Sequence, residues 1–134
     1  QVALEWNLVA AEGEARAYPV AVERRGEMSE IDLRPTVRGV VDELIAGVPP
    51  PVVSARFHHA LAEAAAAAVA EAAERHGPLP VVLTGGCFQN ARLVADVRRR
   101  LEPAHRVWQH GEVPPGDGGL ALGQALVADA VGRA

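Results

Sequence analysis

A strand–helix–strand pattern in the second half of the sequence constrains its fold more than any other feature. Residues 80–84 form a short apolar run without alternation, which is typical of a parallel strand buried on both faces, and the run ends at Gly85 and Gly86. A helical pattern follows and stops at Pro103, and a second strand is expected over residues 106–110. Two strands joined by a helix in about thirty residues form a parallel unit with a right-handed crossover. The sequence therefore predicts an α/β fold.

Proline and glycine mark the ends of a long helix before this unit. Three prolines at positions 49–51 precede a helical pattern over residues 53–76, and Gly77 ends it. Ten of the fourteen residues from 60 to 73 are alanine, so the helix can approach a neighbour closely. A final helix is expected over residues 119–131. The long helix should turn Phe57, Leu61, Ala64, Ala68 and Ala72 inward and Arg56, Glu63, Glu71 and Glu74 mostly outward.

The first third of the chain is less regular. Residues 1–50 are expected to form a connector part, and residues 51–134 the core βαβα part. Residues 18–22 and 30–33 suggest two short strands joined by a charged turn. The apolar residues between 37 and 45 repeat at helical spacing, so we expect a helix that lays this stripe on the core.

Composition narrows the classes of function and partner. The 134 residues suit a single domain, and all 13 basic residues are arginine, which excludes mechanisms that need a lysine amine. The arginines are scattered and 17 acidic residues make the net charge −4, so nucleic acid is not expected as a partner. Cys87 is the only cysteine, which favours a reducing compartment and therefore the cytoplasm. No stretch has the length of a membrane span. A helical pattern that already begins at Gln1 indicates part of a longer protein.

Two loops are candidates for a functional site. Both strands of a parallel unit end at one edge of the sheet, so residues 85–90 and 111–119 should face each other there, where open α/β sheets bind ligands. Gly85 and Gly86 allow the backbone to approach a ligand, and the amides that open the next helix suit a phosphate or another anion. A tight turn that needs glycine for its geometry alone is the alternative.

Two polar side chains accompany these glycines. Asn90 could add a directed side-chain contact to the ligand. Asp117 lies among glycine and proline residues, where its carboxylate could bind a metal or a ribose. It could equally cap the final helix, and the two roles are compatible.

The histidines and the cysteine form no obvious site. His58 and His59 lie about 100° apart around a helix, so they make a poor chelating pair, and a surface or packed position is favoured for each. His105 and His110 should face opposite sides of a strand. Cys87 lies near a helix N-terminus, where a thiolate can be stabilised, but no histidine lies within the local motif to act as a base. A small residue packed in the turn is therefore the favoured interpretation of Cys87.

Two long motifs resemble a known family. The run LTGGCFQN at residues 83–90 and the run VPPGDGGLALGQ at residues 113–124 resemble the C-terminal end of the hydrogenase-maturation carbamoyltransferases, HypF. Residues 32–35 and 55–58 resemble upstream segments of the same family. Carbamoyltransferases that act on small molecules, and the enzymes that build threonylcarbamoyladenosine in tRNA, share the glycine pair, the asparagine and the late aspartate. The Phe-Gln pair at 88–89 points to the hydrogenase branch.

The resemblance implies the second lobe of an actin-like (ribonuclease H-like) ATPase fold, with a mixed sheet flanked by helices. In the family, carbamoyl phosphate and ATP give carbamoyl adenylate in another domain. The lobe pair then transfers the carbamoyl group to the C-terminal cysteine of a partner, HypE, where it becomes the cyanide ligand of nickel–iron hydrogenase. The isolated chain should be inactive, because it lacks the first lobe. The alternatives are a lobe of a small-molecule O-carbamoyltransferase and a catalytically silent docking lobe.

The resemblance also implies roles for four residues. Gly85 and Gly86 would approach the phosphate of ATP, AMP, ADP or carbamoyl adenylate, and Asn90 would contact the adenylate. Asp117 would bind one divalent metal, iron or zinc, together with two histidines of the first lobe. No residue of this chain is assigned as a catalytic acid, base or nucleophile.

Overall fold

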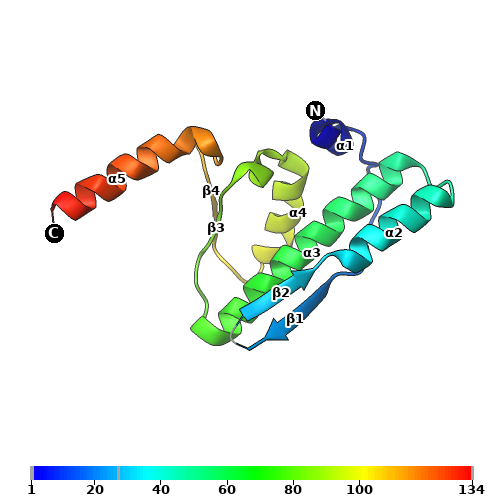
Figure 1. Cartoon of the computed structure of the whole chain (residues 1–134), viewed down its shortest axis with the longest axis horizontal. Helices are drawn as coiled ribbons and strands as arrows, with labels where there is room; N and C mark the ends of the chain where they lie inside the picture. The colour runs from blue at the N-terminus through cyan, green and yellow to red at the C-terminus, as the bar shows by residue number, and fades with distance from the viewer. Residues whose placement is uncertain (1, 27, 134) are drawn as a thin grey trace.

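The helix α3 (Pro50–His76) organises the molecule, because elements on both of its sides pack against it (Figure 1). The computed structural model describes residues 2–26 and 28–133, with side chains from residue 5 onward, so Gln1 lies outside the described residues. On one side of α3 lie a hairpin and α2, and on the other lie α4 and a pair of strands. The other elements are α1 (Val2–Leu8), β1 (Ala21–Arg25), β2 (Met28–Asp32), α2 (Arg34–Ile45), β3 (Val81–Leu83), η1 (Gly86–Gln89), α4 (Ala91–Leu101), β4 (Val107–Gln109), η2 (Asp117–Gly119) and α5 (Leu120–Gly132).

The prediction of a long helix between proline and glycine is confirmed. The helix begins at Pro50, three residues earlier than expected, with Pro49 as its N-cap. Prolines are tolerated in the first turn because the N–H groups of that turn have no partner within the helix. Gly77 ends the helix with φ of +79°, a conformation that glycine adopts without strain.

Two pairs of strands flank α3, and the prediction of an α/β fold is confirmed. β1 and β2 pair antiparallel, as the predicted hairpin, over residues shifted by a few positions from those expected. β3 and β4 pair in parallel, with Val81 opposite Val107 and Leu83 opposite Gln109. Within the described ranges, the antiparallel pair and the parallel pair therefore form two separate two-stranded sheets and not one mixed sheet.

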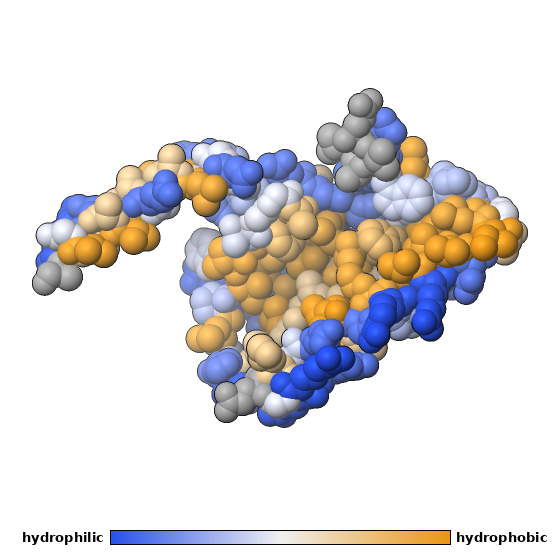
Figure 2. Space-filling model, in the orientation of Figure 1, coloured by the Kyte–Doolittle hydropathy of each residue, from blue (hydrophilic) through white to orange (hydrophobic). Residues whose placement is uncertain are grey.

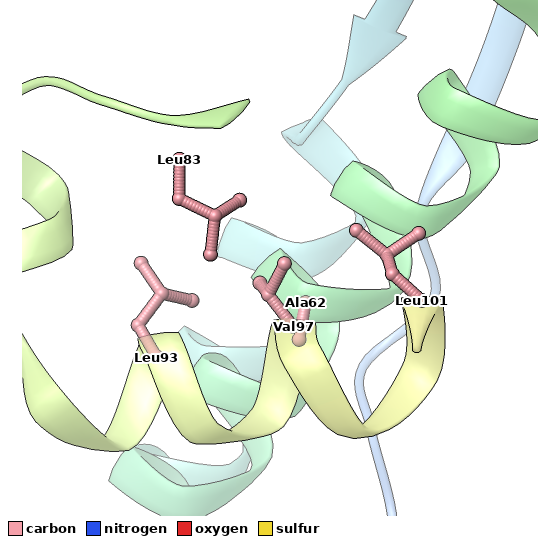
Figure 3. Packing of buried hydrophobic residues seen from close by; sticks show 5 residues of the cluster. All are labelled: Ala62, Leu83, Leu93, Val97 and Leu101. Atoms are coloured by element: carbon pink, nitrogen blue, oxygen red, sulfur yellow. The ribbon is translucent and has the colours of Figure 1, made fainter. Parts of the chain in front are cut away.

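The larger apolar core lies between the parallel strands, α3 and α4. Leu83 from β3 packs against Leu93, Val97 and Leu101 of α4 and against Ala62 of α3 (Figure 3). Leucine and valine on α4 fill this space because the alanines of α3 leave room for them. This core fixes the position of β3 and therefore of the loop that follows it.

The prediction that the strand at residues 80–84 is buried on both faces is wrong. Side chains alternate along a strand, so Val82 points away from the core that Leu83 enters, and 60% of Val82 is exposed. Its partner in the register, Trp108, is exposed as well. No element in the described part of the chain packs on this face.

A second core joins residues 1–50 to α3, and Arg56 lies beside it. The prediction that Arg56 faces outward is wrong, because its guanidinium is buried and forms ion pairs of 2.8 Å with Glu14 and 2.5 Å with Glu43. Tyr18 also donates a 2.5 Å hydrogen bond to Glu43. Burial, and next the hydrogen bond to Glu43, raise the pKa of the Tyr18 phenol well above its ordinary value. These contacts connect segments far apart in sequence, and the sequence pattern of α3 alone contains no signal for them.

The helices α2 and α5 each expose several apolar side chains. The prediction that the stripe on α2 lies on the core is wrong for most of its members, since only Val40 packs there. Figure 2 shows apolar side chains gathered over α2 and along one side of α5, which extends away from the body. Among the described residues, no helix is both long and apolar enough to cross a membrane. The large exposed side chains on these helices are Val37, Val41, Leu44, Ile45, Leu120, Leu122, Leu126, Val127 and Val131.

Candidate functional site

The two loops that were predicted to share an edge of the sheet are in contact. Gly85 follows β3, and its backbone N–H donates a 2.6 Å hydrogen bond to the carbonyl oxygen of Pro115. Its φ of +99° is one that residues with side chains rarely adopt, which accounts for glycine at this position. The prediction that the glycine turn and the later loop face each other is confirmed.

Glycines also keep the second loop compact. A Cβ atom on Gly119 would lie 2.7 Å from the carbonyl oxygen of Pro114, and one on Gly116 would lie 3.1 Å from Nε2 of Gln89. The N–H of Gly119 donates a 2.9 Å hydrogen bond to the carbonyl oxygen of Gly116. Side chains at these positions would push the loop apart and away from the glycine turn, so the sequence keeps the two loops close.

A cavity of about 1030 Å³ opens between the two loops and α5. Its volume is at the upper end of the range that small-molecule and cofactor sites occupy. The wall contributed by α5 is mostly apolar, whereas the loop walls supply backbone and polar groups. The loop residues that line the cavity include Thr84, Gly85, Gly86, His110, Pro115 and Asp117.

Asp117 places a carboxylate at this cavity. The side chain is exposed, and η2 and α5 have Gly116 and Gly119 as their N-caps, with no side-chain capping hydrogen bond at either. The interpretation of Asp117 as a helix cap therefore has no support in this geometry. Across residues 2–26 and 28–133, no group of three or more histidine, cysteine or acidic side chains could hold a metal. A metal at Asp117 would need further ligands from elsewhere.

Asn90 holds the start of α4. Its Oδ1 accepts a 3.0 Å hydrogen bond from the backbone N–H of Leu93, and its Nδ2 lies 2.9 Å from Nε2 of His58. The side chain is not among the groups that line the cavity. Asn90 is therefore the N-cap of α4, and its amide already has two protein partners.

Sequence reasoning missed His110. Its Nε2 lies 3.0 Å from Oγ1 of Thr84, and both residues line the cavity. Each directly follows one of the two paired strands, Thr84 after β3 and His110 after β4. That shared position at the carboxyl ends of parallel strands was the signal that could have identified the pair.

The other candidate residues, two histidines and the cysteine, lie in different environments. His58 and His59 are both buried and have different partners, so of the surface and packed positions that were predicted for them, each occupies a packed one. The prediction that Cys87 packs in the turn is wrong, because its side chain is exposed. Its neighbour Phe88 is the residue of η1 that packs against the core.

Comparison with known proteins identifies the family. Residues 1–124 match the family described as Carbamoyltransferase, Kae1-like Domain, second subdomain. The chain is 43% identical over 102 residues to Carbamoyltransferase HypF of Rhodobacter capsulatus, which covers 72% of this chain and 14% of the relative. It is 50% identical over 78 residues to a Carbamoyltransferase HypF homolog of Cupriavidus necator, which covers 56% of this chain and 19% of that protein.

Solved structures agree with this assignment. A crystal structure of full-length HypF in the phosphate- and nucleotide-bound form matches with a TM-score of 0.89 and 27% identity, over 96% of this chain and 17% of that one. The crystal structure of T. kodakarensis HypF matches with a TM-score of 0.77 and 26% identity, over 96% and 16% of the two chains. The chain thus spans less than a fifth of the length of each of these relatives, and it belongs to the family of HypF Kae1-like carbamoyltransferase subdomains.

Proposed function

We propose that this chain is the C-terminal nucleotide-binding lobe of a HypF-like carbamoyltransferase and works together with further domains of a larger polypeptide. The observation that carries the proposal is the 2.6 Å hydrogen bond between Gly85 and Pro115, which joins the two loops at one cavity. The small share of each relative that the chain covers supports the larger assembly. The matching HypF structure bound to phosphate and nucleotide supports a nucleotide as the ligand.

The proposed anion site is the turn between β3 and η1. Because the N–H of Gly85 already bonds to Pro115, the amides that a phosphate would meet are those of Gly86 and Cys87. Within the described ranges these two N–H groups, at the first turn of η1, have no hydrogen-bond partner. The ligand would be ATP, its product AMP or ADP, or carbamoyl adenylate. The Asn90 side chain is outside the cavity wall, so its contact with the adenylate, through the second hydrogen of Nδ2, would require the ligand to extend beyond the cavity.

The proposed metal site uses Asp117 as the one ligand from this chain. The exposed carboxylate on the cavity wall fits a divalent cation, iron or zinc, whose other ligands come from two histidines of the first lobe. The metal would supply positive charge close to the phosphate of the nucleotide. Asp117 would hold it against the same cavity that the Gly86 amide faces.

The proposed reaction moves a carbamoyl group from carbamoyl adenylate to the C-terminal cysteine of a HypE-like partner in the cytoplasm. The bond between the carbamoyl carbon and the phosphate oxygen breaks, a bond between that carbon and the cysteine sulfur forms, and the thiol loses its proton. AMP leaves as an anion, and the amides of Gly86 and Cys87 would stabilise its charge. Within the maturation of nickel–iron hydrogenase, the transferred group would become a cyanide ligand.

A substitution at Gly86 tests the nucleotide site. A Cβ atom on Gly86 would meet no atom within 4 Å, so Gly86→Val should leave the fold intact and occupy the space that a phosphate needs. The adenylate-forming domain of the larger carbamoyltransferase also takes ATP, so we expect Gly86→Val to weaken one ATP site at least about tenfold in calorimetry, the loss of one charge-assisted contact, and to leave the other site unchanged. Gly111→Val is the matched control, because Gly111 also has open space and lies outside the cavity wall. Equal affinities for the two variants would contradict the nucleotide assignment.

A substitution at Asp117 tests the metal site. Asp117→Asn should lower the metal content of the larger carbamoyltransferase and reduce carbamoyl transfer to a peptide that ends in cysteine. Metal content is measured by elemental analysis and transfer by mass spectrometry of the peptide. Unchanged metal content would remove Asp117 from the metal site. Transfer to a small hydroxylated acceptor, with none to the peptide, would instead favour an O-carbamoyltransferase. Absence of both, with retained binding to the other domains, would favour a docking lobe.

A further inference from the structure

A series of hydrogen bonds connects α3 to the start of α4. Nδ1 of His58 lies 2.8 Å from the carbonyl oxygen of Ser54, and its Nε2 lies 2.9 Å from Nδ2 of Asn90. Oδ1 of Asn90 accepts the 3.0 Å hydrogen bond from the N–H of Leu93. His58 is only 3% exposed, so its ring is shielded from water, whereas Asn90 is half-buried.

The chemistry of these partners fixes the state of the His58 ring. A carbonyl oxygen can only accept, so Nδ1 of His58 must carry the hydrogen and donate it to Ser54. In a neutral imidazole Nε2 is then the acceptor, and it receives a hydrogen from the Asn90 amide. This donor in turn orients the amide so that Oδ1 faces Leu93. Each group in the series therefore has a single assignment, as donor or as acceptor, that matches its hydrogen-bond partner.

The series extends to the glycine turn through the backbone. The N–H of Asn90 donates to the carbonyl oxygen of Cys87 at 3.2 Å, and the N–H of Phe88 donates to that of Gly85 at 3.0 Å. η1 spans the residues between the turn and Asn90, so holding Asn90 in place also holds η1 and the amides of Gly86 and Cys87. Because α3 is the central helix, His58 lies on the most firmly packed element near the site.

We propose that His58 is a positioning residue, which holds Asn90 and through it the Gly85–Gly86 turn in the conformation that receives the nucleotide. The inference rests on the proposed function for its effect on binding. It assigns His58 no contact with nucleotide, metal or carbamoyl group. It also explains why a polar ring occupies a position on α3 that lies between fully buried apolar residues, Ala55 and Ala60.

His59 provides the matched control. It is also buried on α3, but its Nε2 lies 2.6 Å from the carbonyl oxygen of Glu14 and its Nδ1 lies 3.0 Å from Oδ2 of Asp96. Neither contact involves Asn90 or the glycine turn. His58→Leu and His59→Leu should therefore both destabilise the fold, while only the first should loosen the turn. His58→Gln keeps an acceptor oxygen for Asn90 and should restore the turn.

The experiment compares these variants in the larger carbamoyltransferase by two measurements. We expect His58→Leu to weaken ATP binding about three- to tenfold at the site that Gly86→Val affects, the effect of one hydrogen bond, and His58→Gln to recover most of it. Hydrogen–deuterium exchange of the peptide covering residues 85–95 should be faster in His58→Leu and unchanged in His59→Leu. In an Asn90→Ser background, where serine still caps α4 but cannot reach His58, His58→Leu should cause no further loss.

The outcomes separate this inference from the proposed function. If ATP binds and His58→Leu changes neither its affinity nor the exchange of residues 85–95, His58 does not position the turn. The same conclusion follows if His59→Leu has an equal effect on both. If no ATP site of the larger protein responds to Gly86→Val but exchange in this peptide still depends on His58, the positioning role stands and the nucleotide assignment is wrong.

Discussion

The helices α3 and α5 differ in the opposite sense from what their compositions predict, because α5 is the more apolar of the two and yet α3 is the one that is packed against neighbours. α3 has buried residues over its first half and contacts α1, α2, α4 and both hairpin strands. Every residue of α5 from Leu120 to Gly132 is exposed, although Asp129 is the only charged residue among them. A helix that is apolar on all sides is normally buried. The contrast shows that composition sets the tendency of a helix to be buried, while its neighbours decide whether burial happens.

The larger assembly that we propose would supply a neighbour for α5. The chain spans 14% of the HypF protein of Rhodobacter capsulatus and 17% of the full-length HypF crystal structure. We expect other domains of the larger carbamoyltransferase to pack on α5, with the cavity between α5 and the two loops at or near that contact. Three matched pairs of substitutions compare the stability of the body around α3 with that of α5.

We expect the largest difference in unfolding free energy between substitutions of two arginines, one in the body and one beside α5. Arg56→Met would leave the carboxylates of Glu14 and Glu43 partly buried without their partner, which should lower the free energy of unfolding by about 3 kcal/mol. Arg133→Met removes an exposed ion pair with Asp129 beside α5 and should change it by less than about 0.5 kcal/mol. Denaturant unfolding of the two variants measures both values. Similar losses would mean that α5 is held as firmly as the body.

We expect a smaller difference in unfolding free energy between substitutions of two leucines, one in the core and one on α5. Leu101 is 3% exposed in the core of Figure 3, and Leu101→Ala should cost about 2 to 3 kcal/mol of unfolding free energy through the cavity that it leaves. Leu126 is 62% exposed, and Leu126→Ala should change it by less than about 0.5 kcal/mol. Repeating Leu126→Ala in the larger carbamoyltransferase sharpens the comparison. The cost should rise there if other domains cover α5, and an unchanged cost would contradict that expectation.

Replacing a glycine by alanine should lower the stability of the protein in α2 and raise it in α5. A Cβ atom on Gly39 of α2 would lie 2.7 Å from Cδ1 of the buried Tyr18 ring, so Gly39→Ala should destabilise the body by about 1 to 2 kcal/mol. A Cβ atom on Gly123 of α5 would meet no atom within 4 Å, so Gly123→Ala should stabilise the helix by up to about 1 kcal/mol. Thermal unfolding followed by circular dichroism distinguishes the two. A loss at Gly123 would place an unseen neighbour against α5.

The sequence predicted the parallel unit well, because its signals are local. The apolar runs, Gly85 and Pro103 mark the ends of strands and helices wherever neighbouring elements lie. Burial was predicted less well. The stripe on α2 showed which side of the helix is apolar, but periodicity cannot show whether another element covers it. Arg56 was assigned to the surface because its partners, Glu14 and Glu43, are distant in sequence.

In the candidate site, too, some features could be predicted from sequence and others could not. That the two loops face each other followed from topology, since parallel strands end at one edge, and this prediction is confirmed by the hydrogen bond from Gly85 to Pro115. The hydrogen bond between His58 and Asn90 joins side chains 32 positions apart and leaves no pattern in either segment. Side-chain pairing across elements of this kind needs coordinates, whereas backbone geometry at glycine could be inferred from sequence.

The smallest expected effect is a dependence on pH where the hairpin meets α2. Asp32 accepts hydrogen bonds of 2.8 Å from Nε and Nη2 of Arg34 and one of 2.9 Å from its backbone N–H. These bonds lower the pKa of Asp32 from 3.8 to about 2. A lowered pKa in the folded state means that the stabilising contribution is present above the unfolded value and is lost as the pH falls through about 2. Asp32→Asn should therefore melt at a lower temperature than the unaltered chain at pH 6, and the difference should shrink between pH 4 and pH 2. Because Asp32 belongs to the body, the unfolding of α5 should not depend on pH in this way. If the difference in melting temperature stays constant between pH 4 and pH 2, the variant acts through the shape of the side chain and not through its charge.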